Sequence, residues 1–231
     1  MKTTNIQSSE LNYDHYSADK YDRDIINAIP HHKELHEEMV KYFKNNFNRN
    51  KKYAVLDLGV GTGITSEIIK NALPRLELDV VDFSKKMLAG AKKKLGAKNV
   101  NYLFGDYSKM RFSRKYDMIV SVIGVHHQNN VGKRLLFKKI FSSLKPGGVF
   151  IFGDLVTYKD EKVAALNQAI HLCHLVKNAS DDRTLKDWAH HHLFLNELAP
   201  IEDQSVWLKE SGFRVMKALL KINTALLICK K

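Results

Sequence analysis

The sequence predicts an α/β protein with a mostly parallel sheet and helices on both faces of that sheet. Between residues 53 and 155, short apolar runs alternate with helical patterns, which implies right-handed crossovers between parallel strands. A glycine-rich turn follows the first of these runs, at the strand end where such sheets bind ligands. Two apolar runs at 213–219 and 225–229 have the spacing of a terminal antiparallel hairpin.

The strands before the hairpin are each expected from a short apolar run that is bounded by turn residues or by a helical pattern. Runs of this length and composition are typical of buried strands in a parallel sheet. They are expected at residues 53–58, 76–81, 100–104, 118–123 and 149–155.

Helices are predicted where apolar residues recur every three or four positions. A first amphipathic helix is expected at about 31–48, and the helix that begins at Ile64 should stop before Pro74. Ser84 and Gly96 fit the N-cap and C′ positions of the next helix. A further helix ends at the turn 146–148, residues 159–200 hold two helical stretches without a clear strand, and a last helix closes at 206–212.

The composition is that of a globular enzyme and excludes two other classes of protein. Of 231 residues only two are cysteines, far apart, which argues against a disulfide framework and for a reducing compartment. The polar N-terminus lacks the apolar core of a signal peptide, and no apolar run approaches the ~20 residues that span a bilayer. A cytoplasmic protein is therefore expected. Its net charge of +12 comes from scattered lysines, which solvated helix faces explain better than a nucleic-acid surface does.

The glycine-rich turn carries the functional argument. The stretch V-L-D-L-G-V-G-T-G places Asp57 near a strand end, and then Gly59, Gly61 and Gly63 before a helix. Glycines allow the backbone to turn sharply and a ligand to touch the main chain. The N-terminus of the following helix offers N–H groups to an anionic group such as a carboxylate.

The spacing of this turn separates it from two related nucleotide motifs. A dinucleotide fingerprint needs a small residue where this chain has Ile64, and a phosphate-binding P-loop needs a Gly-Lys-Ser/Thr run that does not follow. Asp82 ends the second strand, 19 residues beyond Gly63. A carboxylate at this strand end is suited to hold a ribose diol by two hydrogen bonds.

In order and spacing these motifs resemble those of the class I S-adenosylmethionine-dependent methyltransferases. The resemblance covers about residues 53–155, through the segments 57–63, 82, 105–107, 115–121 and 144–148. It implies a Rossmann-like, seven-stranded sheet with one antiparallel strand, which the terminal hairpin fits. It also implies S-adenosyl-L-methionine as the cofactor and methyl transfer as the reaction.

The resemblance assigns the residues of the glycine-rich turn to the methionine end of the cofactor. Gly59, Gly61 and Gly63 would pass under the methionine moiety and the ribose. Asp57 would orient the methionyl amine through water.

Residues after the second and third strands are assigned to the nucleoside end. Asp82 would hold the ribose hydroxyls, Phe83 and Met87 would pack on the adenine, and Asp106 would accept a hydrogen bond from its exocyclic amine. Further cofactor contacts are expected at Tyr21, Tyr107 and Ser121.

His126 and His127 are the candidate catalytic residues. They follow the fourth strand, which should open beside the sulfonium, and a neutral imidazole there could take a proton from an oxygen, nitrogen or sulfur. A general base helps only if the acceptor must lose a proton, so the acceptor atom stays open. A structural role, capping the next helix or packing on the loop, is the alternative.

No metal site is expected. His171 and His174 lie three residues apart, and residues 190–192 are three successive histidines. No carboxylate or cysteine at ligand spacing completes either group, and successive side chains on a helix point in different directions.

The expected acceptor is a small molecule. The chain has no N-P-P-Y-like run and no Pro-Cys nucleophile after the fourth strand, and no appended RNA-binding module. The flanks, at Tyr13, Tyr16, 21–22 and 29–30, resemble the carboxy-S-adenosylmethionine synthase-like and tRNA uridine-modification branch. Three alternatives therefore stay open: a tRNA-modification enzyme, a carboxy-S-adenosylmethionine synthase-like enzyme, and a non-catalytic cofactor-binding partner protein. No membrane partner is expected, and the oligomeric state is open, a homodimer included.

A single domain in four parts is expected from these assignments. The parts are an N-terminal arm and cap helix at 1–50, a cofactor-binding core at 51–156, a helical insertion or lid at 157–203, and a C-terminal helix and hairpin at 204–231. Residues 1–30 and 157–200 should form a mobile lid over the acceptor, because ligands of open α/β sheets sit outside the carboxyl ends of the strands. The tyrosines expected to close on the cofactor are Tyr13, Tyr16 or Tyr21.

Overall fold

The computed structural model describes residues 18–231, so the roles expected of Tyr13 and Tyr16 fall outside the described residues. The helices are α1 (Ala18–Ala28), α2 (His32–Asn46), α3 (Ile64–Ala72), α4 (Lys85–Leu95), η2 (Val125–His127, a 3₁₀ turn), α5 (Asn130–Ser143), α6 (Glu161–Asn178), α7 (Asp182–Phe194) and α8 (Ile201–Glu210). The strands are β1 (Tyr53–Leu58), β2 (Leu76–Asp82), β3 (Val100–Phe104), β4 (Tyr116–Val122), β5 (Leu144–Leu155), β6 (Arg214–Lys221) and β7 (Thr224–Lys230).

The seven strands form one sheet in the order β3-β2-β1-β4-β5-β7-β6. All pairings from β3 to β5 are parallel, whereas β7 is antiparallel to both of its neighbours. The predicted mostly parallel sheet with a terminal antiparallel hairpin is therefore confirmed. The strand order reverses between β1 and β4, and this switch point is where open α/β sheets bind ligands.

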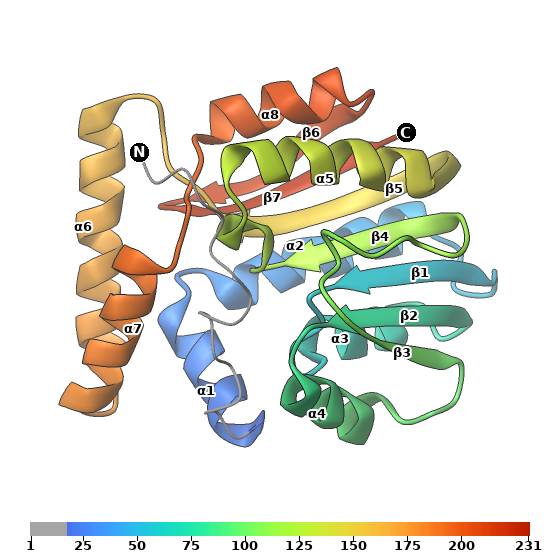
Figure 1. The fold of residues 1–231 in the computed structure, drawn as a ribbon, viewed down its shortest axis with the longest axis horizontal. Coiled ribbons are helices and arrows are strands. Elements are labelled where there is room, and N and C mark those ends of the chain that lie inside the picture. The colour runs from blue at the N-terminus through green and yellow to red at the C-terminus, as the bar shows by residue number, and fades with distance from the viewer. Residues whose placement is uncertain (1–17) are drawn as a thin grey trace.

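Alternating side chains of the strands feed two hydrophobic cores, one on each face of the sheet. Met118 and Val120 of β4 belong to the core that α2, α3 and α4 cover, whereas Ile119 belongs to the core under α5 and α8. Figure 1 shows α5 and α8 in front of the sheet and α2 and α3 behind it. The molecule thus has three layers, and the central strands are buried on both faces.

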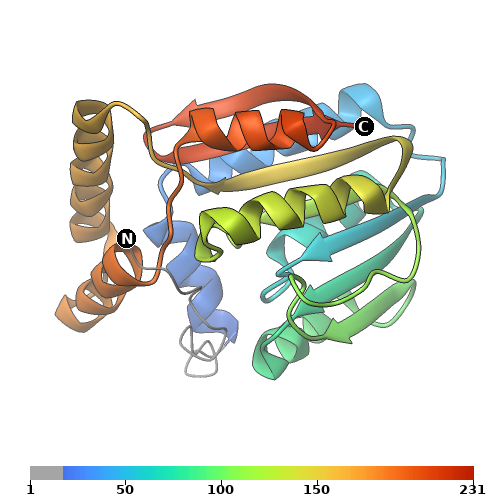
Figure 2. The same cartoon turned by 45° about the horizontal axis from the view of Figure 1, so that its top comes forward.

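Three helices gather at one end of the sheet. Figure 1 shows α1, α6 and α7 at the end to which the arrows of β1 and β4 point, and the turned view keeps α6 and α7 beside α1 (Figure 2). They lie where a parallel sheet places its ligand, outside the carboxyl ends of the strands. No helix among residues 18–231 combines the length and the apolar character needed to cross a membrane.

Two strands begin earlier than the sequence predicted. Tyr116 of β4 pairs with Leu144 of β5, and the register then shifts before Met118 pairs with Val149. The segment 145–148 is therefore an irregularity within a strand pair, not a turn that precedes the strand. The apolar pattern alone could not reveal this pairing, because the Pro-Gly-Gly run interrupts it.

Candidate active site

The glycine-rich loop joins β1 to α3 beside the switch point of the sheet. Gly59, Gly61 and Gly63 have φ angles of 75°, 54° and 93°, in the region that L side chains rarely adopt. A Cβ on Gly63 would also lie 3.2–3.3 Å from atoms of Ala91 and Leu95 in α4. The loop conformation and the close packing of α3 on α4 therefore both depend on glycine.

Two buried carboxyl groups flank this loop on neighbouring strand ends, as predicted. Asp57 at the end of β1 is 1% exposed and accepts a hydrogen bond of 2.6 Å from the Ser66 hydroxyl. Burial raises the pKa of Asp57 to about 7, and the nearby Asp82 carboxylate adds to the rise. Asp82 at the end of β2 accepts hydrogen bonds of 2.9 Å from the backbone N–H groups of Gly61 and Ser84. Asp82 thus fixes the loop that it adjoins.

Helix α1 covers the glycine-rich loop. Asp22 accepts a short hydrogen bond from the Thr62 hydroxyl and pairs with Lys94 of α4 at 2.6 Å. Tyr21 lies so close that a Cβ on Gly61 would be 3.6 Å from its ring. Beneath α1 the loop lines a cavity of about 40 Å³. The loop residues that line this cavity and the two carboxyl groups nearby fit a ligand that carries an amine and a ribose diol.

The residues expected at the adenine lie next to this loop, along β2, α4 and the segment after β3. Phe83 is half-buried, whereas Met87 is buried at the start of α4. Asp106 accepts a hydrogen bond of 2.8 Å from the Ser108 backbone N–H and so shapes the turn after β3. Contact of these three side chains with adenine stays a prediction.

Tyr107 and Ser121 lie beneath the loop and bond to backbone. The Tyr107 hydroxyl donates to the Gly124 carbonyl at 3.0 Å, and its ring would be 3.5 Å from a Cβ on Gly59. The buried Ser121 hydroxyl donates to the Leu58 carbonyl at 3.1 Å. Both side chains therefore support the loop from below, and their contact with the cofactor stays a prediction.

A second cavity, of about 90 Å³, lies between α1, α6 and α7 and the ends of β4 and β5. Among the described residues, three polar atoms at this cavity are buried without a hydrogen-bond partner: Asp24 Oδ2, His192 Nδ1 and Asn196 Oδ1. Buried polar atoms without a partner cost free energy, so a ligand that bonds to them gains affinity. The remaining lining is mainly apolar, with further histidines at His126, His171 and His191.

The two cavities share Tyr21, Ile25 and Ile123 in their linings. Ile123 follows β4 with a φ of 54°, which is strained for a β-branched residue. Strain of this kind collects at ligand sites, where surrounding contacts hold it. Both cavities are smaller than the ~300–1,000 Å³ typical of ligand pockets. The covering helices must therefore shift to admit ligands.

His126 is paired with a buried aspartate that the sequence analysis did not identify. Its Nδ1 lies 2.5 Å from Asp154 Oδ1, and its backbone N–H donates to Asp154 Oδ2 at 2.9 Å. Burial lowers the pKa of His126 to about 3, which keeps the imidazole neutral, and raises the pKa of Asp154 to about 7. When Asp154 is ionised, it accepts from Nδ1–H in this contact, which leaves the lone pair of the imidazole on Nε2.

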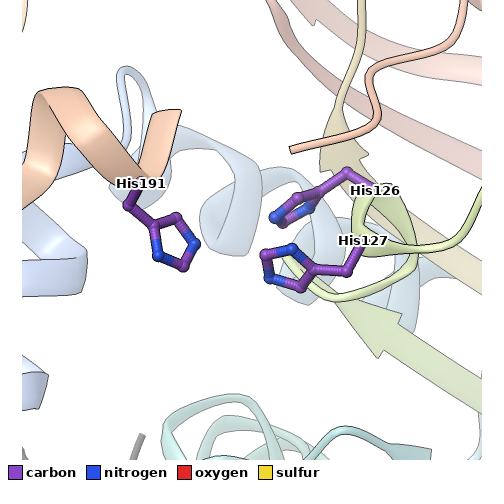
Figure 3. Close-up of side chains that lie close together, drawn as sticks. All are labelled: His126, His127 and His191. Atoms are coloured by element: carbon purple, nitrogen blue, oxygen red, sulfur yellow. The ribbon is translucent and has the colours of Figure 1, made fainter. Parts of the chain in front are cut away.

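His127 and His191 complete a cluster of three imidazoles. His127 Nδ1 donates to the Leu195 carbonyl at 2.9 Å, and its ring centre lies 4.0 Å from that of His126 and 5.2 Å from that of His191. One nitrogen of each ring lies within 4.8 Å of one nitrogen of the other two. Figure 3 shows the rings facing one another, with His191 coming from α7 and the other two from η2.

Hydrogen bonds join the two segments that carry these histidines. The buried Lys133 ammonium of α5 donates to the Glu197 carbonyl at 2.5 Å and to the Gln128 carbonyl. The Glu197 backbone N–H donates to the His126 carbonyl at 2.8 Å. The loop after β4 and the loop after α7 are therefore held together by these hydrogen bonds.

Comparison with known proteins connects this arrangement to a family. Residues 55–148 match the family model of the methyltransferase domain. The chain is 27% identical over 194 residues to the malonyl-[acyl-carrier protein] O-methyltransferase of Priestia megaterium, across 80% of this chain and 65% of that protein. The chain is thus similar to methyltransferases in sequence, most clearly over residues 55–148, and it has their fold. The resemblance predicted from the sequence is therefore confirmed, and it supports S-adenosyl-L-methionine as the cofactor.

Further relatives of this chain vary in their named activity. A carboxy-S-adenosyl-L-methionine synthase of Campylobacter fetus is 26% identical over 67% of this chain and 65% of its own length. An O-methyltransferase family protein from Burkholderia thailandensis shares the fold with a TM-score of 0.68 and 17% identity, over 97% of this chain and 63% of that one. The chain spans between 38% and 65% of the length of the first three curated relatives.

Sequence reasoning found the loop and its carboxylates but missed Asp154 and His191. Asp154 could have been noticed, because an aspartate within a buried apolar strand needs a partner. His191 was considered only with its neighbours on one helix, and its actual partners are more than 60 residues earlier in the chain. The other histidines considered for metal have different contacts: His171 and His174 bond to the backbone carbonyls of Ala28 and Asn27 and so fasten α6 to α1.

Proposed function

We propose that this methyltransferase transfers the methyl group of S-adenosylmethionine to a small acceptor held between α1, α6 and α7. The observation that carries the proposal is the shared lining of the two cavities by Tyr21, Ile25 and Ile123. An acceptor in the larger cavity would lie directly beside the glycine-rich loop. The bound cofactor supplies a methyl group on a sulfonium, so the protein chiefly has to align the acceptor and exclude water.

The cofactor would be held by the residues around the glycine-rich loop. Asp82 would accept from the ribose hydroxyls, and Asp57 would orient the methionyl amine through water. The adenine would lie between Phe83, Met87 and Asp106. Gly59, Gly61 and Gly63 would let the ligand touch the main chain of the loop.

His126 would serve as the proton acceptor for an acceptor that must lose a proton. Its Nε2 carries the lone pair, because Asp154 holds Nδ1 in the protonated form. Asp154 would also stabilise the imidazolium that forms, as a positioning residue. His127 would complete the wall of this site, with its Nδ1 held by the Leu195 carbonyl.

The lining of the cavities favours a neutral or cationic small acceptor and an ordinary cofactor. Among the described lining residues of both cavities there is no arginine or lysine, whereas Asp24, His192 and Asn196 offer unpartnered polar atoms. A carboxylated cofactor or a polyanionic acceptor would need a cationic partner there. The lining therefore supports the small-molecule acceptor over the RNA and carboxylated-cofactor alternatives.

The test is formation of S-adenosylhomocysteine with separate pools of small alcohols, phenols, amines and thiols. Malonyl-loaded acyl carrier protein and bulk tRNA serve as the two contrasting acceptors. We expect turnover with a small-molecule pool. Turnover with tRNA alone would overturn the proposal, and cofactor binding without turnover in any arm would favour a non-catalytic partner protein.

A matched pair of variants tests the role of Asp154. Asp154→Asn should lower kcat at least tenfold and leave S-adenosylhomocysteine affinity unchanged, because the general base loses its orienting carboxylate. Asp203→Asn, on the exposed pair with Lys159, is the control that should retain the wild-type rate. Equal rates for both variants would remove Asp154 from the mechanism.

A further inference from the structure

We propose that His126, His127 and His191 bind one divalent transition-metal ion, with an open coordination position that faces the acceptor cavity. The sequence analysis expected no metal, because it examined neighbouring histidines only. The fold instead brings together residues from η2 and α7, with one nitrogen per ring in a common region (Figure 3). Three imidazoles suit zinc, copper, nickel or iron, and three protein ligands with an open fourth position are typical of catalytic zinc.

The spacing of the three nitrogens is close to that of a tetrahedral site. Nitrogens about 2.0–2.1 Å from a tetrahedral zinc lie about 3.4 Å apart. The three nitrogens lie within 4.8 Å of one another, so the rings have to approach by little more than 1 Å. Small side-chain rotations provide a movement of this size.

The hydrogen-bond acceptors next to His126 and His127 are of the kinds that orient metal-binding histidines. Metal-bound histidines usually donate their second ring N–H to a carboxylate or a backbone carbonyl. His126 has Asp154 in this position at 2.5 Å, and His127 has the Leu195 carbonyl at 2.9 Å. Both contacts involve Nδ1, so Nε2 is the nitrogen that would coordinate from these two rings. The pattern therefore appears twice within one cluster.

The environment also keeps the ligands available for a metal. His126 and His127 are buried and His191 is half-buried, so the three rings are sheltered from bulk water. The hydrogen bonds of Lys133 and Glu197 hold the two loops together before any ion binds. The fold therefore positions the ligands before the metal binds, which reduces the conformational entropy lost on binding.

The fourth coordination position of the metal would face the cavity between α1, α6 and α7. His126 and His191 line the larger cavity, so the fourth ligand of the metal would come from that cavity. This step rests on the proposed function, because it takes the acceptor to bind there: its oxygen, nitrogen or sulfur atom would coordinate the ion. A metal on Nε2 and a proton taken by Nε2 exclude one another, so metal loading also decides between the two roles of His126.

The experiment is a titration of the tag-free, chelator-stripped protein with Co²⁺, followed by its visible d–d absorption, and with Zn²⁺ in competition with an indicator dye. We expect one equivalent of either ion per chain. His191→Ala should weaken binding more than a hundredfold, and Asp154→Asn tenfold to a hundredfold, the usual loss for an outer-shell partner. Circular dichroism checks that each variant is folded.

The matched control is His190→Ala, which removes an exposed histidine next to His191 that packs on Phe194 instead. It should bind the metal like the wild type. Absence of stoichiometric binding, or equal binding by the His191→Ala and wild-type proteins, would overturn the site. S-adenosylhomocysteine binding and methyl transfer by the stripped protein are measured alongside. If these persist without metal binding, the metal site fails and the proposed function stands.

Discussion

The two carboxyl groups beside the glycine-rich loop have different surroundings, and this sets different expectations for them. Asp82 accepts hydrogen bonds from two backbone N–H groups, which fix the orientation of its carboxyl group. Asp57 has one hydroxyl partner and is buried, so its proton is held to a higher pH. One residue is thus prepared to accept hydrogen bonds from the ribose, and the other changes charge near neutral pH.

Replacing Asp82 by alanine should weaken S-adenosylhomocysteine binding at least tenfold. The ribose loses a charge-assisted partner worth about 1.5–3 kcal/mol, and the Gly61 amide loses the acceptor that holds the loop. Calorimetry measures the loss, and Asp82→Asn shows how much of it is due to charge. Equal affinity of the alanine variant and the wild type would remove Asp82 from the cofactor site.

Binding of S-adenosylhomocysteine should tighten about tenfold between pH 6 and pH 8. The folded-state pKa of Asp57 is about 7, against an ordinary value of 3.8, so the carboxylate that can accept from the methionyl ammonium forms only as the pH rises through 7. For the protein alone the sign is opposite: unfolding releases this proton between pH 4 and 7, so the free energy of unfolding falls as the pH rises. Asp57→Asn should flatten both profiles. A binding profile that survives the substitution would exclude Asp57 as its source.

At the scale of elements, two glycines with the same kind of backbone conformation differ in how closely other elements pack against them. Gly63 lets α3 approach α4, whereas Gly147 lies in the irregular segment of β5 with nothing near its α-carbon on the side-chain side. Both have positive φ, 93° and 73°. Alanine substitutions at these two glycines therefore distinguish the free-energy cost of backbone strain from the cost of a steric clash with α4.

Gly63→Ala should destabilise the protein by about 2–4 kcal/mol and Gly147→Ala by about 1–2 kcal/mol. Both alanines carry the strain of a left-handed conformation, and only the first also collides with Ala91 and Leu95 of α4. Urea unfolding of the two variants measures the difference. Equal losses would mean that α4 yields freely to the added methyl group.

Hydrogen exchange in α1, α6 and α7 should slow when S-adenosylhomocysteine binds. The cavities beneath these helices are smaller than the usual ligand pocket, so the helices must open to admit ligand and close again over it. Asp22 links α1 directly to the loop through Thr62, so α1 should respond most. Protection restricted to residues 57–107 would rule out a lid.

At the scale of the whole molecule, the sequence predicted what local periodicity and motif spacing determine. The strand 53–58, the glycine-rich turn and Asp82 follow from short stretches of chain, and the structure has them as expected. The pairing of His126 with Asp154 and the approach of His191 depend on how β5 and α7 return to the end of β4. Such contacts between distant segments leave no periodic signal in one sequence. On the acceptor side, the sequence therefore identified His126 and His127 but not their contacts with Asp154 and His191.

The distribution of charge over the whole molecule predicts that RNA binds weakly and is not methylated. Binding of a single strand draws mainly on phosphate neutralisation, with a slope of log K against log salt near −0.7 per contact. The densest lysines lie along α4, which packs on β2 and β3 away from α6 and α7 (Figure 1), and Lys94 is already paired with Asp22. Lys133, the lysine nearest the histidines, is buried and bonded to backbone carbonyls.

Few phosphate contacts can therefore form around the cavity opening, and binding of bulk tRNA should disappear by about 0.2 M salt. The decisive measurement is transfer of a labelled methyl group into RNA from a strain that lacks this enzyme, beside the same assay with the small-acceptor pools. Label in the RNA would show that the acceptor reaches the histidines without a basic surface to guide it. Label in a small molecule alone would agree with a small cavity whose described lining contains histidine and aspartate but no lysine or arginine.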